Sequence, residues 1–278
     1  MKEALVILSG GQDSTAALFW ARIKGFDVLH ALTFDYGQRH LTEIKSAGQV
    51  SYLAGVQSHE IVHMGPILKG TSPLTNPEVT LAQYPDGDLP GGLEKTFVPM
   101  RNQLFLTLAA NRSYVLGGIP VIIGVSQEDY GGYPDCREGF LISFEETSAL
   151  GTFTGEDGAP DGLSILTPWL NLTKAEEIQE TYNMGRPQGT LCEAFTALAF
   201  SHTSYDGAYP PTGSDHATKL REKGFAEAGL PDPLIVRAAL VDKVMELPDA
   251  PNYDRSLTLN LALEIRNTVR GLKEIGLL

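Results

Sequence analysis

Short apolar runs alternate with longer amphipathic stretches along the first 200 residues of the chain. The runs that we predict to be strands are at residues 4–8, 27–34, 60–63 and 120–125, with a short one near Ile165. The stretches with helical spacing begin at about Ser14 and continue at residues 42–53, 102–110 and 136–150. This alternation is typical of βαβ units. We therefore predict an α/β fold, an open Rossmann-like parallel sheet with helices on both faces.

The segments outside this alternation have patterns of their own. Residues 65–96 lose periodicity and are rich in Pro, Gly, Thr and Asp, which indicates a long surface loop that acts as a lid or binding segment. Thr173 and Glu176 have the spacing of a capping box, so a helix should start there. Residues 201–213 are irregular, and residues 216–278 are expected to form two or three helices.

The composition of the chain indicates which kinds of binding partner and which cellular compartment to expect. The 278 residues can bury a sizeable core, and we expect an α/β domain at residues 1–200 followed by a helical region at residues 201–278. The net charge is −13, so we expect no direct nucleic-acid partner and favour a small-molecule substrate. The chain opens as a strand and lacks a run of about 20 apolar residues, and its two cysteines suit a reducing compartment. We expect a cytoplasmic protein without a membrane segment.

A Gly-rich turn between the first predicted strand and helix carries the clearest chemical signal. Its residues are Leu8, Ser9, Gly10, Gly11, Gln12, Asp13, Ser14 and Thr15. The backbone N–H groups of such a turn converge with the positive end of the helix dipole, and small glycines let phosphate oxygens approach closely. The spacing matches neither the Walker A motif nor the dinucleotide-binding fingerprint. We predict that this turn binds the phosphates of a nucleotide.

Three further segments are candidates for the rest of the site. In open α/β sheets, ligands bind beyond the carboxyl ends of the strands, which is where residues 35–40, 97–102 and 124–137 should lie. The last segment is dense in aromatic and hydrogen-bonding side chains. Tyrosines there offer flat faces to a planar heterocycle, and carboxylates can accept hydrogen bonds from the N–H and amino edge of a guanine-like base.

These segments also carry a resemblance to a known family. In order, the chain contains SGGQDST, FDYGQRH, TFVPMRN, GVSQEDYGGYPDCR and LTKAE. With these motifs in register over residues 4–230, it resembles the 7-cyano-7-deazaguanine synthase family, the QueC-type branch of the ATP pyrophosphatase superfamily. The resemblance implies an adenine nucleotide α-hydrolase-like fold and an ATP-dependent carbon–nitrogen ligase. Members of that family use ATP with Mg²⁺ and ammonia to convert 7-carboxy-7-deazaguanine into the nitrile through an amide.

The resemblance implies roles for individual residues. Asp13 and Lys174 would be needed for pyrophosphate release, and Arg101 would hold a phosphate or the substrate carboxylate in a fork. The deazaguanine pocket would be lined by Asp129, Tyr130, Tyr133, Asp135 and Arg137, with Tyr36, Gln38 and Phe97 as further candidates. Cys136 lies inside the same motif, but no base stands beside it in the sequence. We expect Cys136 to be a small packed residue and not a nucleophile.

The chain departs from the family near its C-terminus, where the family carries a four-cysteine zinc site. The residues at the thiolate positions are Ser204, Thr212, Asp215 and Thr218. Neutral hydroxyls are poor zinc ligands, so we expect no zinc and a segment at residues 201–221 that hydrogen bonds and packing must keep ordered. A metal site improvised from His202, His216 and Asp215 is disfavoured.

Several functions remain open at this point. The first is adenylation of the deazaguanine acid with ammonia as acceptor, in a divergent paralogue that serves DNA-base modification in a phage or a defence operon. The second is adenylation with another acceptor, such as the amine of a partner protein, which a widened pocket at Gly131 would suit. The third is a non-catalytic nucleotide-binding subunit, which the intact phosphate turn and Lys174 disfavour. The resemblance suggests a homodimer.

Overall fold

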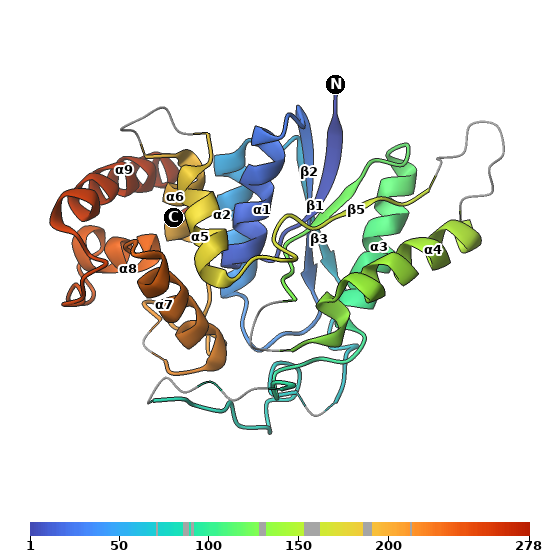
Figure 1. Cartoon of the computed structure of the whole chain (residues 1–278), viewed down its shortest axis with the longest axis horizontal. Helices are drawn as coiled ribbons and strands as arrows, with labels where there is room; N and C mark the ends of the chain where they lie inside the picture. The colour runs from blue at the N-terminus through green and yellow to red at the C-terminus, as the bar shows by residue number, and fades with distance from the viewer. Residues whose placement is uncertain are drawn as a thin grey trace.

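A parallel β-sheet forms the centre of the protein (Figure 1). The computed structural model describes residues 1–70, 72–85, 89, 92–127, 132–152, 162–185, 191–211 and 213–278. Within these ranges the sheet has five strands, all parallel, in the order β3-β2-β1-β4-β5. The strands are β1 Glu3–Ile7, β2 Val28–Asp35, β3 Ser58–His63, β4 Val121–Ile123 and β5 Ile165–Leu166. The predicted α/β fold with an open parallel sheet is confirmed.

Helices cover both faces of the sheet because the central strand is apolar on both sides. Ala4 and Val6 pack into one hydrophobic cluster, and Leu5 and Ile7 pack into another on the opposite face. The covering helices are α1 Gln12–Ile23 and α2 Thr42–Ala54 on the first face, and α3 Arg101–Val115 and α4 Glu138–Thr152 on the second. The register pairs Ile7 with both Leu32 and Ile123, so the carboxyl ends of β1, β2 and β4 lie together.

Two predicted helix starts shift in the structure, and one is confirmed. Helix α1 begins at Gln12 and not at Ser14, because the extended Gly11 is its N-cap. Helix α4 begins at Glu138, since Pro134–Cys136 forms a separate 3₁₀ turn. The capping box is confirmed: the Thr173 Oγ1 accepts a hydrogen bond from the Glu176 N–H, and the Thr173 N–H donates to the Glu176 carboxylate.

The C-terminal region is helical, as predicted. Its elements and those leading into it are α5 Lys174–Asn183, α6 Glu193–Ala197, the 3₁₀ turn Leu198–Phe200, α7 His216–Ala228, α8 Pro233–Val236, the π-helical turn Arg237–Val241 and α9 Arg255–Glu274. Helix α9 buries Leu261, Ile265, Val269 and Leu272 at a spacing of three or four residues. These side chains belong to the same hydrophobic cluster as Ala4 of β1. The division into two regions at residue 200 stays a prediction.

The described residues between 65 and 96 form neither helix nor strand. This segment runs below the sheet and α7 in Figure 1. It is tied to the C-terminal region, because the Tyr84 N–H donates to the Ser214 carbonyl at 2.6 Å and the Ser214 hydroxyl donates to the Gln83 amide oxygen at 2.9 Å. None of the helices described is both long and apolar enough to cross a membrane.

Candidate active site

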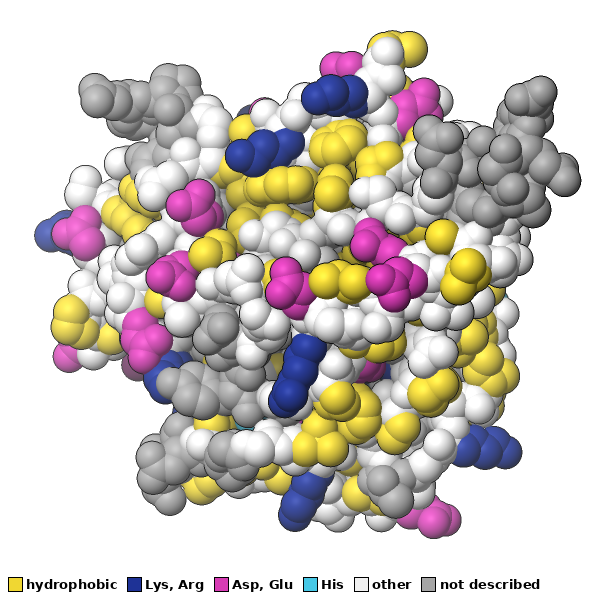
Figure 2. All heavy atoms as spheres, turned by 45° about the vertical axis from the view of Figure 1, so that its right-hand side comes forward, with side chains coloured by type: hydrophobic (Ala, Val, Ile, Leu, Met, Phe, Trp, Pro, Cys, Tyr) yellow, Lys and Arg dark blue, Asp and Glu magenta, His cyan; other side chains and the backbone are white. Residues whose placement is uncertain are grey.

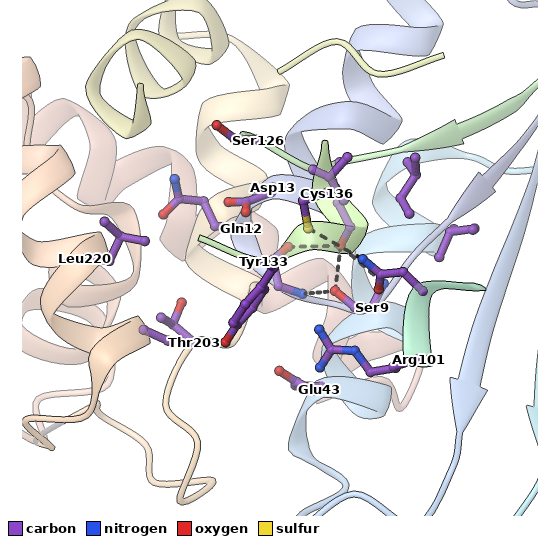
Figure 3. A pocket seen from close by; sticks show the side chains of 18 of the residues that line it. Ser9, Gln12, Asp13, Glu43, Arg101, Ser126, Tyr133, Cys136, Thr203 and Leu220 are labelled. Carbon is purple, nitrogen blue, oxygen red and sulfur yellow. Dashed lines mark hydrogen bonds between the residues drawn. The ribbon is translucent and has the colours of Figure 1, made fainter. Parts of the chain in front are cut away.

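A cavity of about 310 Å³ lies at the carboxyl ends of β1, β2 and β4 (Figure 3). Its wall combines the turn after β1, the starts of α2 and α3, the turn around Tyr133, Lys174 of α5, the segment after Phe200 and the start of α7. Residues from both ends of the chain therefore meet in one space. A crevice at this edge of a parallel sheet is where α/β proteins bind their ligands.

The turn after β1 has the geometry of an anion cradle. Gly10 has φ +89°, and a β-carbon there would lie 2.1 Å from the Glu43 carbonyl oxygen, so only glycine fits. The Gly11 N–H and the Ser14 hydroxyl both contact the Ser9 hydroxyl, at 3.2 and 3.0 Å. The Thr15 hydroxyl donates to the Gly11 carbonyl at 2.7 Å. This network holds the turn at the start of α1, where the helix dipole favours negative charge.

Lys174 reaches this turn from α5. Its side chain is buried, and its Nζ donates to the Asp13 carboxylate at 2.7 Å and to the Glu177 carboxylate at 2.9 Å. Asp13 remains one-third exposed and lines the cavity, whereas Glu177 is buried behind it. These two negative carboxylates fix the ammonium beside the turn at residues 9–15, which we call the phosphate-binding turn after its predicted role.

Helix α7 determines the path of the Lys174 side chain. A β-carbon added to Gly224 would lie 2.5 Å from Cγ and 3.1 Å from Cβ of Lys174, and 3.0 Å from Cδ1 of Ile178. β-Carbons in proteins do not approach other heavy atoms to within 3.0 Å. Any residue larger than glycine at this position would therefore push the aliphatic part of the Lys174 side chain aside.

Arg101 lines the cavity from the start of α3, beside Glu43 (Figure 3). Burial lowers its pKa, but the neighbouring tyrosines and Asp135 outweigh burial, so the net pKa is raised and the guanidinium stays charged. Burial also raises the pKa of Tyr36, Tyr133 and Tyr205, which keeps their hydroxyls protonated at neutral pH. This side of the cavity combines one cation with aromatic rings, which suits a planar ligand that carries a carboxylate.

Met100, just before α3, has φ +66°, a left-handed conformation that glycine adopts most easily. The Met100 side chain is exposed to solvent.

Most of the predicted phosphate-binding and cationic residues line the cavity, together with two of the tyrosines predicted for the deazaguanine pocket. They are Leu8, Ser9, Gly11, Gln12, Asp13, Ser14, Tyr36, Arg101, Tyr133 and Lys174. Gln12 is only 6% exposed, and its side-chain nitrogen has no hydrogen-bond partner among the described residues. A buried donor of this kind needs an acceptor, which a bound ligand would supply.

Other predicted residues lie outside the wall. Gly10 and Thr15 shape the turn, and Gln38 accepts a hydrogen bond from the Tyr36 N–H at 3.0 Å. Phe97 packs against the Tyr133 ring with centroids 5.4 Å apart. Asp135 is buried in the 3₁₀ turn, Arg137 follows that turn, and Asp129 and Tyr130 lie outside the described residues.

The cavity also contains residues that the motifs did not single out as site residues. From the first 200 residues these include Glu43, Asn102, Ser126 and Cys136. From the C-terminal region they include His202, Thr203, Tyr205, His216, Leu220 and Arg221. In the sequence, the second group is marked only by its position in or near residues 201–221, where the zinc-binding cysteines of the family are replaced. Cys136 is buried, as expected, and its Sγ lies 3.5 Å from the Asn102 amide nitrogen.

Arg221 fixes the C-terminal part of the wall. Its guanidinium makes two hydrogen bonds to the buried Asp232 carboxylate, at 2.7 and 2.8 Å, and also donates to Ser201 and Thr203. The neighbouring His202 N–H donates to the Gly10 carbonyl at 2.8 Å. Through these bonds, the segment after Phe200 is held against the phosphate-binding turn.

Direct hydrogen bonds join three of the four residues that stand where the family has zinc-binding cysteines, namely Ser204, Asp215 and Thr218. The Asp215 carboxylate accepts from the hydroxyls of Ser204 and Thr218, at 3.1 and 2.8 Å, and from the Thr218 N–H at 3.1 Å. Thr212 lies outside the described residues. Burial lowers the pKa of His202 to about 4, and its ring donates to the Ser204 carbonyl at 2.7 Å. The described ranges contain no group of three His, Cys, Asp or Glu residues arranged to hold a metal.

The fold and this cavity define an α/β protein with a Gly-rich turn, shaped to hold an anion, at the carboxyl edge of a parallel sheet. The chain belongs to the QueC family, described as "Queuosine biosynthesis protein QueC", which it matches over residues 3–229. The 7-cyano-7-deazaguanine synthase of Gloeobacter violaceus is 45% identical over 84% of this chain and 96% of its own length. The synthases of Chromobacterium violaceum and Laribacter hongkongensis are 41% and 42% identical, over 85% and 86% of this chain. The expectation of an enzyme related to these synthases is confirmed.

Proposed function

We propose that the chain adenylates a 7-carboxy-7-deazaguanine-like acid with ATP and transfers ammonia to it, giving the amide and then the nitrile. The observation that carries this proposal is one cavity that combines two chemically different groups of residues. One group is the phosphate-binding turn with Lys174, and the other is Arg101 with its neighbouring tyrosines. A nucleotide and a planar acid would be brought together there in the orientation that acyl transfer needs.

In the first step, an oxygen of the substrate carboxylate forms a bond to the α-phosphorus of ATP. The bond from that phosphorus to the bridging oxygen breaks, and pyrophosphate leaves with the electron pair. The N–H groups of the turn and the Lys174 ammonium stabilise the charge that develops on the leaving group. Asp13 would hold Mg²⁺ through the carboxylate oxygen that does not bind Lys174, together with the phosphates of ATP, and the metal would offset the phosphate charge.

In the second step, ammonia forms a C–N bond to the acyl carbon, and the bond to the AMP oxygen breaks. The amide oxygen would then form a bond to the α-phosphorus of a second ATP in the same cavity, and pyrophosphate would leave. The carbon–oxygen bond breaks, AMP leaves with that oxygen, and nitrogen gives up two protons as the nitrile forms. Arg101 would hold the acid in place, with Tyr133 against the ring system. Asp129 and Tyr130, which lie outside the described residues, are proposed to complete this pocket.

The test is an assay with ATP, 7-carboxy-7-deazaguanine and ammonium, in which pyrophosphate release and product mass are followed together. Amide or nitrile is the expected product. Adenylate without nitrogen transfer would favour another acceptor, such as the amine of a partner protein. No pyrophosphate release would favour a binding subunit and would contradict the proposal.

We propose further that the chain needs no zinc and that the Asp215 cluster takes the structural place of a metal. Support comes from the hydrogen bonds of Asp215 to Ser204 and Thr218. Replacing Asp215 by Ala should lower the free energy of unfolding by about 2–4 kcal/mol, because it removes an N-cap and leaves the buried Thr218 hydroxyl without its acceptor.

Denaturant unfolding measures this effect. The matched control is Asp254→Ala, which removes an exposed N-cap of α9 alone and should cost about 1 kcal/mol. A chelator should leave the thermal midpoint of the wild type unchanged. Stoichiometric zinc in the purified protein would contradict this account.

A homodimer is proposed through the face formed by α3 and α4. In Figure 2, which brings this side forward, hydrophobic side chains gather in patches on the surface. Val115, Ile142 and Leu150 are among the exposed apolar residues of these helices.

Ile142→Glu should convert a dimer into a monomer, because it places a charge in an apolar interface. Light scattering after size exclusion measures the mass. Leu259→Glu, on the exposed side of α9, is the control, and a monomeric wild type would rule the dimer out.

A further inference from the structure

Glu43 is the second carboxylate in the cavity, and the steps above do not use it. The described lining contains two carboxylates, Asp13 and Glu43. Glu43 lies in the first turn of α2, and its side chain lies next to Arg101 in Figure 3. Its backbone carbonyl touches the phosphate-binding turn at Gly10. The backbone of Glu43 is therefore packed closely against this turn.

The Glu43 carboxylate is not used in the internal bonding of the protein. The Asp13 carboxylate forms an ion pair with the Lys174 ammonium, with 2.7 Å between Oδ1 and Nζ. By contrast, no hydrogen bond or ion pair within the described ranges involves the Glu43 carboxylate, although Arg101 is close enough to influence its charge. Half-buried carboxylates without a partner are uncommon in purely structural positions. This carboxylate is free to accept a proton inside the cavity.

The proposed reaction requires such an acceptor. At neutral pH most ammonia is present as ammonium, which has no lone pair with which to attack the acyl carbon. Of the other titratable groups in the wall, the tyrosines have raised pKa values and the His202 ring donates to Ser204. Asp13 is paired with Lys174, and His216 is buried against the Tyr84 ring. A general base must lie within the cavity and be ionised near the working pH.

We infer that Glu43 is the general base that takes a proton from ammonium before it attacks the adenylate. This inference rests on the proposed function. One proton passes from ammonium to the Glu43 carboxylate, and the freed lone pair forms the bond to the acyl carbon. The bond from that carbon to the AMP oxygen breaks, AMP leaves with the electron pair, and the surplus proton on nitrogen passes to water.

The electrostatics of the cavity agree with this role. Burial raises the pKa of Glu43 to about 7, and the Arg101 guanidinium opposes part of that rise. Tyr36 faces the same space, and its hydroxyl is neutral. Near neutral pH, a large share of Glu43 is ionised, yet its basicity is well above that of an ordinary carboxylate.

The experiment compares two nitrogen nucleophiles in wild type and Glu43→Gln. Hydroxylamine is largely unprotonated at neutral pH, so it does not need the base. With ammonium, we expect the variant to form amide about 100-fold more slowly, the typical contribution of a general base. With hydroxylamine, hydroxamate formation should fall much less. Glu180→Gln, an exposed residue on α5, is the matched control.

Two outcomes would overturn the inference. Equal losses with both nucleophiles would mean that Glu43 acts on the acid or on adenylation, and no loss with either would mean that it has no role. A second readout is the ratio of wild-type to variant amide rates across pH. The ratio should be largest just above pH 7, because Glu43 is protonated below and free ammonia is abundant far above. If the wild type releases no pyrophosphate, the proposed function fails instead.

Discussion

Replacing Lys174 by Ala is expected to lower the rate of pyrophosphate release at least about 100-fold, the usual cost of removing one preorganised group that stabilises developing charge. Lys174 brings a buried ammonium to the phosphate-binding turn, where Asp13 and Glu177 fix its position. Without it, the Asp13 carboxylate would face the phosphates uncompensated, and the buried Glu177 carboxylate would lose its cation. Asp13→Asn should give a loss in the same direction. Initial rates of pyrophosphate release measure both.

The folded state of the Lys174 variant needs its own check, because breaking a buried ion pair can cost about 3–5 kcal/mol of stability. Lys174→Arg keeps the positive charge and should fold, yet a planar guanidinium cannot reproduce the contacts of the compact ammonium with Asp13 and Glu177. Lys219→Ala is the matched control, since Lys219 makes a similar i,i+3 pair with Glu222 outside the cavity wall. Full activity of a folded Lys174→Ala protein would refute the role proposed for this lysine.

The second large effect is expected from a single methyl group on α7. Gly224→Ala should lower pyrophosphate release about 10- to 100-fold, because a displacement of about 1 Å in a reacting group can cost that much. The added β-carbon would lie 2.5 Å from Cγ of Lys174 and must push the ammonium out of place. The rate constant kcat should fall more than the KM for ATP rises, since the turn itself is untouched.

Gly271→Ala controls for the change in helix propensity. Gly271 lies in α9 with nothing within 4 Å of an added β-carbon, so alanine there should stabilise the protein by about 0.5–1 kcal/mol and leave activity unchanged. In the Lys174→Ala background, Gly224→Ala should have no further effect on the rate, because both changes act through one side chain. Additive losses in the double variant would show that Gly224 acts by another route.

Local patterns of the chain contained enough information for the architecture. The apolar runs at β1 and β2 and the helical spacing after them depend only on neighbouring residues, which is why these elements lie within two residues of their predicted positions. The turn at residues 9–15 and the capping box of Thr173 are also local, since a few consecutive backbone groups define them. The shifted starts of α1 and α4 depend on cap geometry, which spacing alone does not determine.

The composition of the cavity, by contrast, was decided by the tertiary structure. Gln38, Phe97 and Arg137 lie in the right segments but outside the wall, because a motif determines the position of a backbone and not the direction in which each side chain points. Glu43 reaches the cavity because α2 packs closely on Gly10.

By itself, the sequence determined the parallel sheet, the phosphate-binding turn and the chemistry that Lys174 and Arg101 can offer, since short-range periodicity and residue type are sufficient for these. Only the tertiary structure brought residues 202–221 against that turn, placed Gly224 under Lys174 and joined Ser204 to Asp215. The physical reason is that these contacts join residues far apart in the chain. They depend on how whole helices pack into one core, and no local pattern records that packing.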